Sequence, residues 1–394
     1  MSSPETIDMF GADGDTSEDA TRDEGTQDGG IDVLPEGIHF DLDEDIYHAD
    51  KSIGSGSVRQ LAKCPVYYWG DSWMNPLREQ KDETPALLYG RALHCLVLEG
   101  TEKFQRQYRR SPTRDDAPDA LDTVSEIKAM LAEIDKDVRK ELGIKLTGSK
   151  EELTGYLRSY APDTVFWADI VAQFQQECAR DKATILNADT YLNIIKAAEY
   201  ITAEESVRAA FQNGVPEISL FWTVDGVPIK ARLDYTRLGK KGKSTVGIVT
   251  DLKSFANIMQ LPPERAVGQA ITKTRLDVQM AAYMDGIQQI PKWISEGKVY
   301  GAEAIEPAWL DALASVSEWQ WYWCFYEKNM PISMLRSVRV GSDLHTIGTA
   351  TYARALQAYR DNVAAFGYDW RFVDPIPDPV IDTQDLPAWH ARDE

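Results

Sequence analysis

The residues best suited to chemistry lie on two predicted strands in the second half of the chain. Asp234 stands in the run KARLDY, and Asp251 and Lys253 stand in TDLKS with Leu252 between them. Because side chains alternate along a strand, Asp251 and Lys253 share one face and Leu252 points to the other. If the two strands pair antiparallel, Asp234 lies next to Asp251 on that face. The pattern therefore predicts two carboxylates and a lysine converging on one side of a sheet.

Such a convergence is costly in a protein interior unless a partner compensates the charges. A divalent cation is a suitable partner, since hard oxygen ligands fit Mg²⁺, which usually takes one or two carboxylates and keeps several waters. Mn²⁺ accepts the same ligands, so the residues do not choose between the two ions. The metal would polarise a scissile phosphate, and Lys253 would position the attacking water or stabilise charge in the transition state. The alternative is a surface salt-bridge trio, because D-x-K alone arises by chance in most chains of this length.

Further residues give the motif a resemblance to a known group. Gln279 and Tyr283 are four residues apart and share one side of a helix expected from about Pro263 to Gly286. His94 stands far upstream, in GRALHCLVLEG. In this order and spacing the motifs resemble the PD-(D/E)XK superfamily of nucleases in its RecB-like form. In chain order they are His94, Asp234, Asp251-x-Lys253 and Gln279-x-x-x-Tyr283.

The resemblance implies an α/β fold and a role for each residue. The fold would be a restriction-endonuclease-like core with a mixed central sheet flanked by helices, plus a helical N-terminal part and an insertion. The implied metal ligands are Asp234 and Asp251, with the Leu252 carbonyl and His94 as further ligands and Glu217 assisting a second metal. Lys253 would be catalytic, and Gln279 and Tyr283 would support the site or contact DNA. The usual proline before the first aspartate is Leu233 here, which costs nothing because the proline carries no chemistry.

Longer stretches are similar to the RecE or exonuclease VIII nucleases of phages and prophages. They cover most of residues 40–390 and include ETPALLYGRALHCLVLEG, QMAAYMDG and a late LPAW at Leu386–Trp389. This likeness implies a 5′→3′ exonuclease on linear double-stranded DNA that leaves 3′ single-stranded tails. It also implies a RecT-like annealing partner and a ring-shaped homo-oligomer.

Two other functions stay open at this point. One is a DNA-binding or assembly subunit that keeps the nuclease fold but does not cut. The intact set of Asp234, Asp251 and Lys253 argues against it, because a degenerate site would be free to lose its costly carboxylates. The other is an endonuclease of the same superfamily, which would carry the same motifs, since end-dependence comes from oligomeric architecture.

Charge divides the chain into an acidic tail and a folded body. Of the net charge of −21 over 394 residues, −15 falls within the first 50, which hold 16 acids and one base, and −6 remains. Residues 1–36 are predicted to be a disordered acidic tail, since they hold few large apolar residues, and residues 37–394 to be the nuclease domain. The mildly acidic body leaves DNA binding open, because a phosphate backbone needs only a local basic surface.

Two further segments are candidates for DNA contact. Residues 112–185 are predicted to be a helical insertion, and within them 137–160 loosely resemble the SAP helix–loop–helix module that binds DNA. The alternative for 137–160 is a plain helical hairpin. Lys273 and Arg275 are expected on the helix that bears Gln279, about one turn away, and so close to bound DNA.

The sequence lacks the patterns of a membrane span, a secretion signal and an iron–sulfur cluster. No apolar run approaches the roughly 18 residues of a membrane span, and the acidic N-terminus lacks a signal pattern. A cytoplasmic protein with no membrane partner is therefore expected. Nucleases with an iron–sulfur cluster need one early and three clustered late cysteines. The four cysteines here are dispersed, so we expect no cluster and read them as reduced thiols. They are Cys64, Cys95, Cys178 and Cys324.

Overall fold

The computed structural model describes residues 32–79, 83–328, 332–368 and 370. Most of the expected acidic tail, residues 1–31, and the late LPAW run at Leu386–Trp389 lie outside these residues. Within them no helix is both long enough and apolar enough to cross a membrane.

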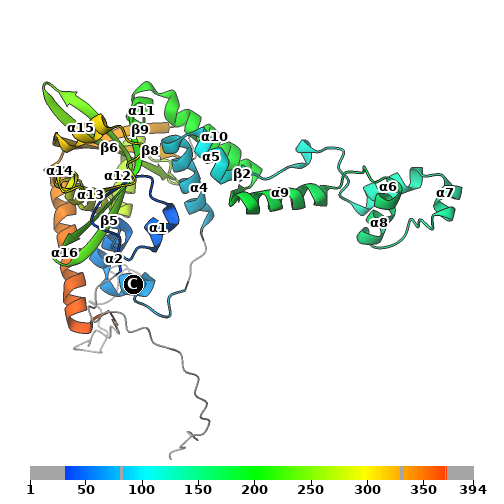
Figure 1. Cartoon of the computed structure of the whole chain (residues 1–394), viewed down its shortest axis with the longest axis horizontal. Helices are drawn as coiled ribbons and strands as arrows, with labels where there is room; N and C mark the ends of the chain where they lie inside the picture. Colours follow the sequence, from blue (N-terminus) through cyan, green and yellow to red (C-terminus); the bar gives the residue numbers. More distant parts are fainter. Residues whose placement is uncertain (1–31, 80–82, 329–331, 369, 371–394) are drawn as a thin grey trace, which may run out of the picture. The chain divides into compact units, whose positions relative to one another are not determined.

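A mixed sheet of seven strands forms the centre of the fold, and Figure 1 labels its strands β5, β6, β8 and β9. The strand order is β7-β1-β4-β5-β6-β8-β9. Strands β1 to β6 in this order pair antiparallel, β6 pairs parallel with β8, and β8 pairs antiparallel with β9. This confirms the α/β fold with a mixed central sheet that the sequence predicts. The strands are β1 Gly37–His39, β4 Gly214–Val224, β5 Val227–Lys241, β6 Ser244–Phe255, β7 Val299–Tyr300, β8 Val316–Glu327 and β9 Ile332–Val338.

Strands β4 and β5 form the hairpin expected from the dipeptide Asp225-Gly226. Both residues have positive φ, 48° and 81°, and Val224 pairs directly with Val227. A two-residue turn with positive φ at both positions matches the twist of the flanking strands, which explains why Asp-Gly closes it. The hairpin fixes the register that later places the site residues.

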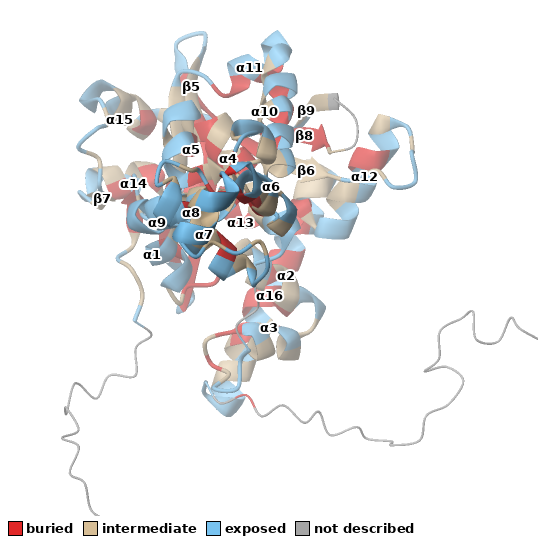
Figure 2. Cartoon of the chain, turned by 90° about the vertical axis from the view of Figure 1, so that its right-hand side faces the viewer, coloured by how far each residue is buried: buried red, intermediate tan, exposed pale blue. Residues whose placement is uncertain are grey.

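Helices cover both faces of the sheet. On one face, α2, α13 and α16 share a hydrophobic cluster with β4, β5, β6 and β8; on the other, α4, a π-helical turn, α10 and α11 share a second cluster. Trp321, Trp323 and Phe325 of β8 belong to the first cluster, and Cys324 and Tyr326 belong to the second, so this aromatic strand is sheet core (Figure 2). The helices before the insertion are α1 Glu44–Ala49, α2 Ser55–Lys63, α3 Pro65–Asp71, α4 Pro85–His94, the π-turn Cys95–Glu99 and α5 Thr101–Gln107. Those after it are α10 Ala188–Ala203, α11 Glu205–Ala210, α12 Pro263–Thr274, α13 Leu276–Ile287, α14 Ile290–Ser295, α15 Pro307–Ala314 and α16 Asp343–Phe366.

The prediction of a single helix from about Pro263 to Gly286 is wrong, because the structure has two helices there, α12 and α13. Arg275 adopts φ +50° and separates α12 from α13. Its guanidinium binds the Asp277 carboxylate in a bidentate ion pair, with Nε–Oδ1 3.0 Å and Nη2–Oδ2 2.9 Å, which stabilises the break. Lys273 therefore lies on a different helix from Gln279.

The segment expected to be a helical insertion begins and ends side by side. Strand β2 (Tyr108–Arg110) pairs parallel with β3 (Thr184–Leu186), which closes the segment between them. Helices α6 (Val124–Glu133), α7 (Lys136–Glu141) and α8 (Lys150–Tyr160) enclose a hydrophobic cluster of their own. Helix α8 opens with the capping box that Ser149 and Glu152 predict, and α9 (Trp167–Asp181) leads back to β3.

Helix α16 approaches α13 most closely at Gly348. A methyl group there would lie 2.2 Å from the Asp277 carbonyl oxygen, so Gly348→Ala forces the two helices apart. We expect a loss of about 1–3 kcal/mol in the free energy of unfolding, measured in urea. The matched control is Gly155→Ala in α8, where nothing lies within 4 Å, and which should gain up to about 1 kcal/mol. Equal effects at the two positions would contradict this close approach.

Candidate metal centre

Three acidic residues occupy the same position on three neighbouring strands. Pro216 pairs with Tyr235 and Ile218 pairs with Leu233, so Glu217 of β4 lies opposite Asp234 of β5. The β5–β6 ladder ends at Tyr235–Thr250, and its next position sets Asp234 opposite Asp251 of β6. Opposite residues of antiparallel strands lie close together, so the register brings the backbones of these three residues side by side.

The strands are irregular at this position. Leu233 and Tyr235 flank Asp234 at alternate positions, yet Leu233 packs in the cluster of α2 and α13 while Tyr235 packs in that of α4 and α10. Glu217 has φ +54°, a conformation that β-strand residues rarely adopt. Because the alternation slips here, Asp234 can reach residues on both sides of the sheet.

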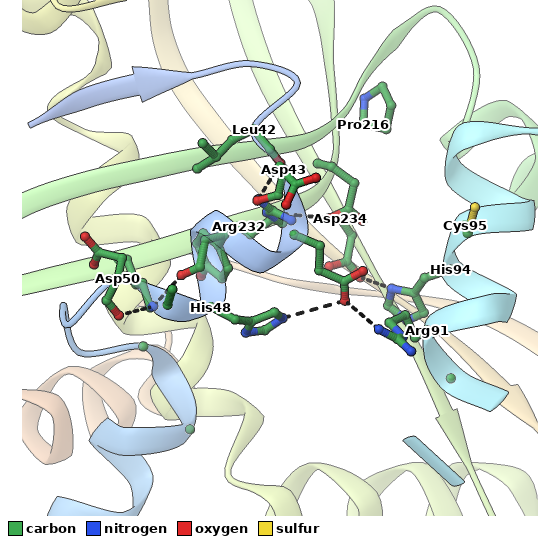
Figure 3. A pocket seen from close by; sticks show the side chains of 18 of the residues that line it. Leu42, Asp43, His48, Asp50, Arg91, His94, Cys95, Pro216, Arg232 and Asp234 are labelled. Atoms are coloured by element: carbon green, nitrogen blue, oxygen red, sulfur yellow. Dashed lines mark hydrogen bonds and ion pairs between the residues drawn. The ribbon is translucent and has the colours of Figure 1, made fainter. Parts of the chain in front are cut away.

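Asp234 is the hub of the contacts. Its Oδ2 accepts a hydrogen bond from the Leu252 amide at 2.7 Å and lies 3.5 Å from Nδ1 of His94 and 3.9 Å from Nζ of Lys253. His94 is the last residue of α4 and points at Asp234 across the cleft (Figure 3). The structure therefore joins residues that are 140 positions apart in the sequence around one carboxylate oxygen.

Asp251 is held from two sides. It is 1% exposed, its Oδ2 lies 2.6 Å from Nζ of Lys253, and its Oδ1 accepts a hydrogen bond from Nε2 of Gln279 at 3.2 Å. Among the described residues Oδ2 has the Lys253 ion pair but no hydrogen bond of good geometry. Gln279 is itself 7% exposed, so in this structure it supports Asp251.

Leu252 and Tyr283 complete the surroundings of the lysine. The Leu252 side chain is fully buried in the second cluster, while its carbonyl oxygen lies 3.4 Å from Nζ of Lys253. Tyr283 of α13 is 7% exposed, lines the cleft and packs edge-on against Trp321 at 5.9 Å between ring centres. The cleft thus has an aromatic wall on the α13 side.

A cation would find its closest donor set at His94, Glu217 and Asp234. One ligand atom from each lies within 4.8 Å of the other two. One imidazole nitrogen and two carboxylate oxygens suit Mg²⁺, Mn²⁺ or a similar divalent ion. The sequence-based expectation paired Asp234 with Asp251 and reserved Glu217 for a second metal; the structure brings Glu217 into the first group and leaves Asp251 beside it, paired with Lys253.

Burial opposes the charged forms of these groups. It raises the pKa of Asp234, raises that of Glu217 well above its usual range and raises that of Asp251 to about 6. Burial, helped by the nearby Lys253 charge, lowers the pKa of His94 to about 4, which leaves the imidazole neutral and able to bind a metal. Burial alone would lower the pKa of Lys253, but Asp251 and Asp234 together raise it. In their charged forms the three acids carry more negative charge than Lys253 offsets, and a bound divalent cation would compensate the excess.

Two cations of β5, Arg232 and Lys230, line the same cleft as two of the acids and were not predicted as site residues from the sequence. Arg232 lies 3.9 Å from Glu217, donates to the Leu42 carbonyl at 2.8 Å, and has its guanidinium 4.2 Å from the ring centre of Tyr47. Lys230 donates to the Tyr47 carbonyl at 2.6 Å. These bonds hold the segment before and within α1 over the sheet. The sequence run K-A-R-L-D does indicate them, because strand alternation places its three charged residues, Lys230, Arg232 and Asp234, on one face of β5.

The site opens into a cleft of about 2120 Å³ between α1, α2, α4 and the sheet. Arg91, one turn before His94 on α4, lies at its mouth and pairs with Glu83 at 2.7 Å and Glu44 at 3.8 Å (Figure 3). The cleft is large enough for a polymer chain, and its lining mixes basic side chains with acidic ones. The basic side chains are Lys51, Arg78, Arg91, Lys103, Arg106, Lys230, Arg232 and Lys328.

The fold and the cluster of acids, histidine and lysine define a class: the chain has the PD-(D/E)XK nuclease fold. It belongs to the family described as PDDEXK-like domain of unknown function (DUF3799), whose model matches residues 55–303, more than half of the chain. The match includes the whole series of site residues from His94 to Tyr283. The comparison with curated proteins found no match. The narrower likeness to RecE nucleases therefore rests on the sequence motifs alone.

Proposed function

We propose that the chain is a metal-dependent deoxyribonuclease that acts as a 5′→3′ exonuclease on linear double-stranded DNA. The observation that carries the nuclease part is the cluster of Glu217, Asp234, Asp251, His94 and Lys253 in a PD-(D/E)XK fold. The direction, the 3′ single-stranded product and a role in phage-type recombination rest on the RecE likeness. So do an annealing partner and a ring-shaped oligomer.

The residues of the site have distinct roles in this proposal. His94, Glu217 and Asp234 hold a divalent cation, which supplies Lewis acidity at the scissile phosphate. Asp251 fixes the ammonium of Lys253 through its 2.6 Å ion pair, and Gln279 fixes Asp251. Lys253 then presents its charge where the pentavalent phosphate develops negative charge. The aromatic wall at Tyr283 keeps this side of the cleft free of bulk water.

Digestion of linear and of covalently closed duplex DNA with Mg²⁺ tests the proposal directly. We expect only the linear form to be degraded, and we expect Asp251→Ala and Lys253→Ala to abolish degradation. The matched control is Lys241→Ala, which removes an exposed lysine from the far end of the same hairpin. Cutting of closed circles would identify an endonuclease, and binding of DNA without cutting would identify a non-catalytic subunit.

The insertion offers a separate test of DNA contact. Leu121 and Phe166 form a bridge at the base of the α6–α8 cluster, so a short glycine–serine linker can replace residues 122–165. If the 137–160 segment binds DNA as its SAP likeness implies, the deletion weakens DNA binding and spares metal binding. Unchanged DNA affinity would end that idea without touching the nuclease proposal, because the site residues lie outside the deleted segment.

A further inference from the structure

A second hollow adjoins the metal cleft and is lined by cations without any acidic side chain. It measures about 780 Å³ and lies between α2 and the junction of α12 with α13. Arg59 and Lys63 come from α2, and Lys273 and Arg275 come from the junction, more than 200 positions later in the sequence. In a chain of net charge −21, four cations converging on an acid-free surface need a reason.

The charges of this cationic groove are largely uncompensated. Arg275 is paired with the buried Asp277. Among the residues that the structure describes, Arg59 donates to the carbonyl oxygens of Thr274, at 2.6 Å, and of Ser55, at 3.3 Å, and forms no ion pair. Lys63 lies over the Tyr67 ring at 5.5 Å, and Lys273 is exposed with no ion pair to any residue of the described ranges. Three positive charges therefore face solvent together.

The cationic groove is continuous with the metal cleft. Gly56 and Ser57, in the first turn of α2, line both hollows. A strand whose scissile phosphate lies at the acids and passes over this turn would meet the cations next. The small side chains at the turn leave its backbone accessible to such a strand.

We propose that the cationic groove binds the phosphate backbone of the DNA next to the segment being cut. This inference rests on the proposed nuclease function and adds a binding surface to it. The ligand chemistry is that of phosphodiesters: the guanidinium of Arg59 is already fixed by two carbonyl oxygens, and the ammonium groups of Lys63 and Lys273 are free to pair. The groove contributes affinity for long DNA and takes no part in bond cleavage, because its residues lie outside the metal donor set.

The test is the salt dependence of DNA binding by a Lys63→Gln/Lys273→Gln double variant. With Ca²⁺ in place of Mg²⁺ to slow cutting, Kd for a duplex is measured across a series of NaCl concentrations. Each lost phosphate contact reduces the slope of log Kd against log salt by about 0.9 for duplex and about 0.7 for single strands. We expect the slope to fall by about 1.4–1.8 and Kd at 0.1 M salt to rise roughly tenfold or more.

Two controls separate the groove from the site. Lys196→Gln/Lys292→Gln makes the same change of charge at exposed positions on α10 and α14 and should leave the slope unchanged. Hydrolysis of thymidine 5′-p-nitrophenyl phosphate, which fills only the metal cleft, should keep its kcat/KM in the groove variant. An unchanged slope, or loss of hydrolysis of this small diester, would overturn the proposal that the groove binds DNA without taking part in cleavage. A wild-type protein that binds no DNA would instead overturn the nuclease proposal.

Discussion

Replacing Asp251 by asparagine is expected to abolish cutting and, at the same time, to make the metal-free protein more stable. Burial raises the pKa of this carboxyl to about 6, so at pH 8 the folded protein holds it ionised against its environment. A shift of about two units corresponds to roughly 2–3 kcal/mol. Asparagine has the same shape and no charge, and Gln279 can keep its hydrogen bond by rotating its amide. We expect up to about 2 kcal/mol of added stability and a loss of activity of roughly 10³-fold, since Lys253 loses the carboxylate that fixes its ammonium and a misplaced charge-stabilising group costs about 10²–10³ in rate.

The dependence on pH gives this prediction its signature. A raised pKa in the folded state means that the contribution of Asp251 to the stability of the metal-free wild type is greatest below about pH 4 and declines as the pH rises through about 6. Asparagine does not titrate. The advantage of Asp251→Asn over the wild type should therefore be absent near pH 4, grow between pH 4 and 7, and stay constant above.

Urea unfolding in EDTA at several pH values measures this difference, and taking it between the two proteins removes the contribution of the acids that do not interact with Asp251. Addition of Mg²⁺ or Mn²⁺ should raise the melting temperature of both proteins, because the donor set of His94, Glu217 and Asp234 is intact in each. An Asp251→Asn protein that is less stable than the wild type at pH 8 would show that the carboxylate is a structural group in the metal-free protein. The nuclease role of Asp251 would then lose this support.

The sequence predicts much of the site because its motifs are local. Strand alternation placed Asp251 and Lys253 together, and the i, i+4 spacing placed Gln279 and Tyr283 on one side of α13. Both arguments need only the geometry of a single element. The Asp225-Gly226 turn then set the register of the hairpin, which brought Asp234 and Glu217 to matching positions on adjacent strands.

The grouping of the ligands could not be predicted in the same way. It depends on the slip of the alternation at Asp234 and on the positive φ of Glu217, and neither leaves a mark in the pattern of apolar residues. The break between α12 and α13 at Arg275 could not be predicted either, because no glycine or proline marks it in the sequence. An ion pair between Arg275 and Asp277 stabilises it. The short strands β1 and β7 were not expected either, because two or three residues are too few to show a period of two.

Removing Lys253 is expected to cost more stability than any other change at the site. Lys253→Met leaves the Asp251 carboxylate, 1% exposed, without the ammonium that lies 2.6 Å from it. An uncompensated buried charge costs about 3–5 kcal/mol, and because the Lys253 side chain is 24% exposed we expect a loss of about 3 kcal/mol at pH 8. The double variant Asp251→Asn/Lys253→Met should be about as stable as Asp251→Asn alone, because the loss of the lysine then leaves no Asp251 charge uncompensated, whereas simple addition of the two single effects would place it about 1 kcal/mol below the wild type.

A double-mutant cycle by urea unfolding in EDTA measures the coupling between the two residues. The control is the exposed pair Lys241–Glu318, 2.8 Å apart, where the same cycle should give less than about 1 kcal/mol. Binding of Mn²⁺ separates the two roles further: it should persist in Lys253→Met, whose activity is lost, because the donor set of His94, Glu217 and Asp234 stays intact. If the effects of the two single changes at the site simply added, Asp251 and Lys253 would not act as a pair. The fixing of Lys253 by Asp251 would then have to be abandoned.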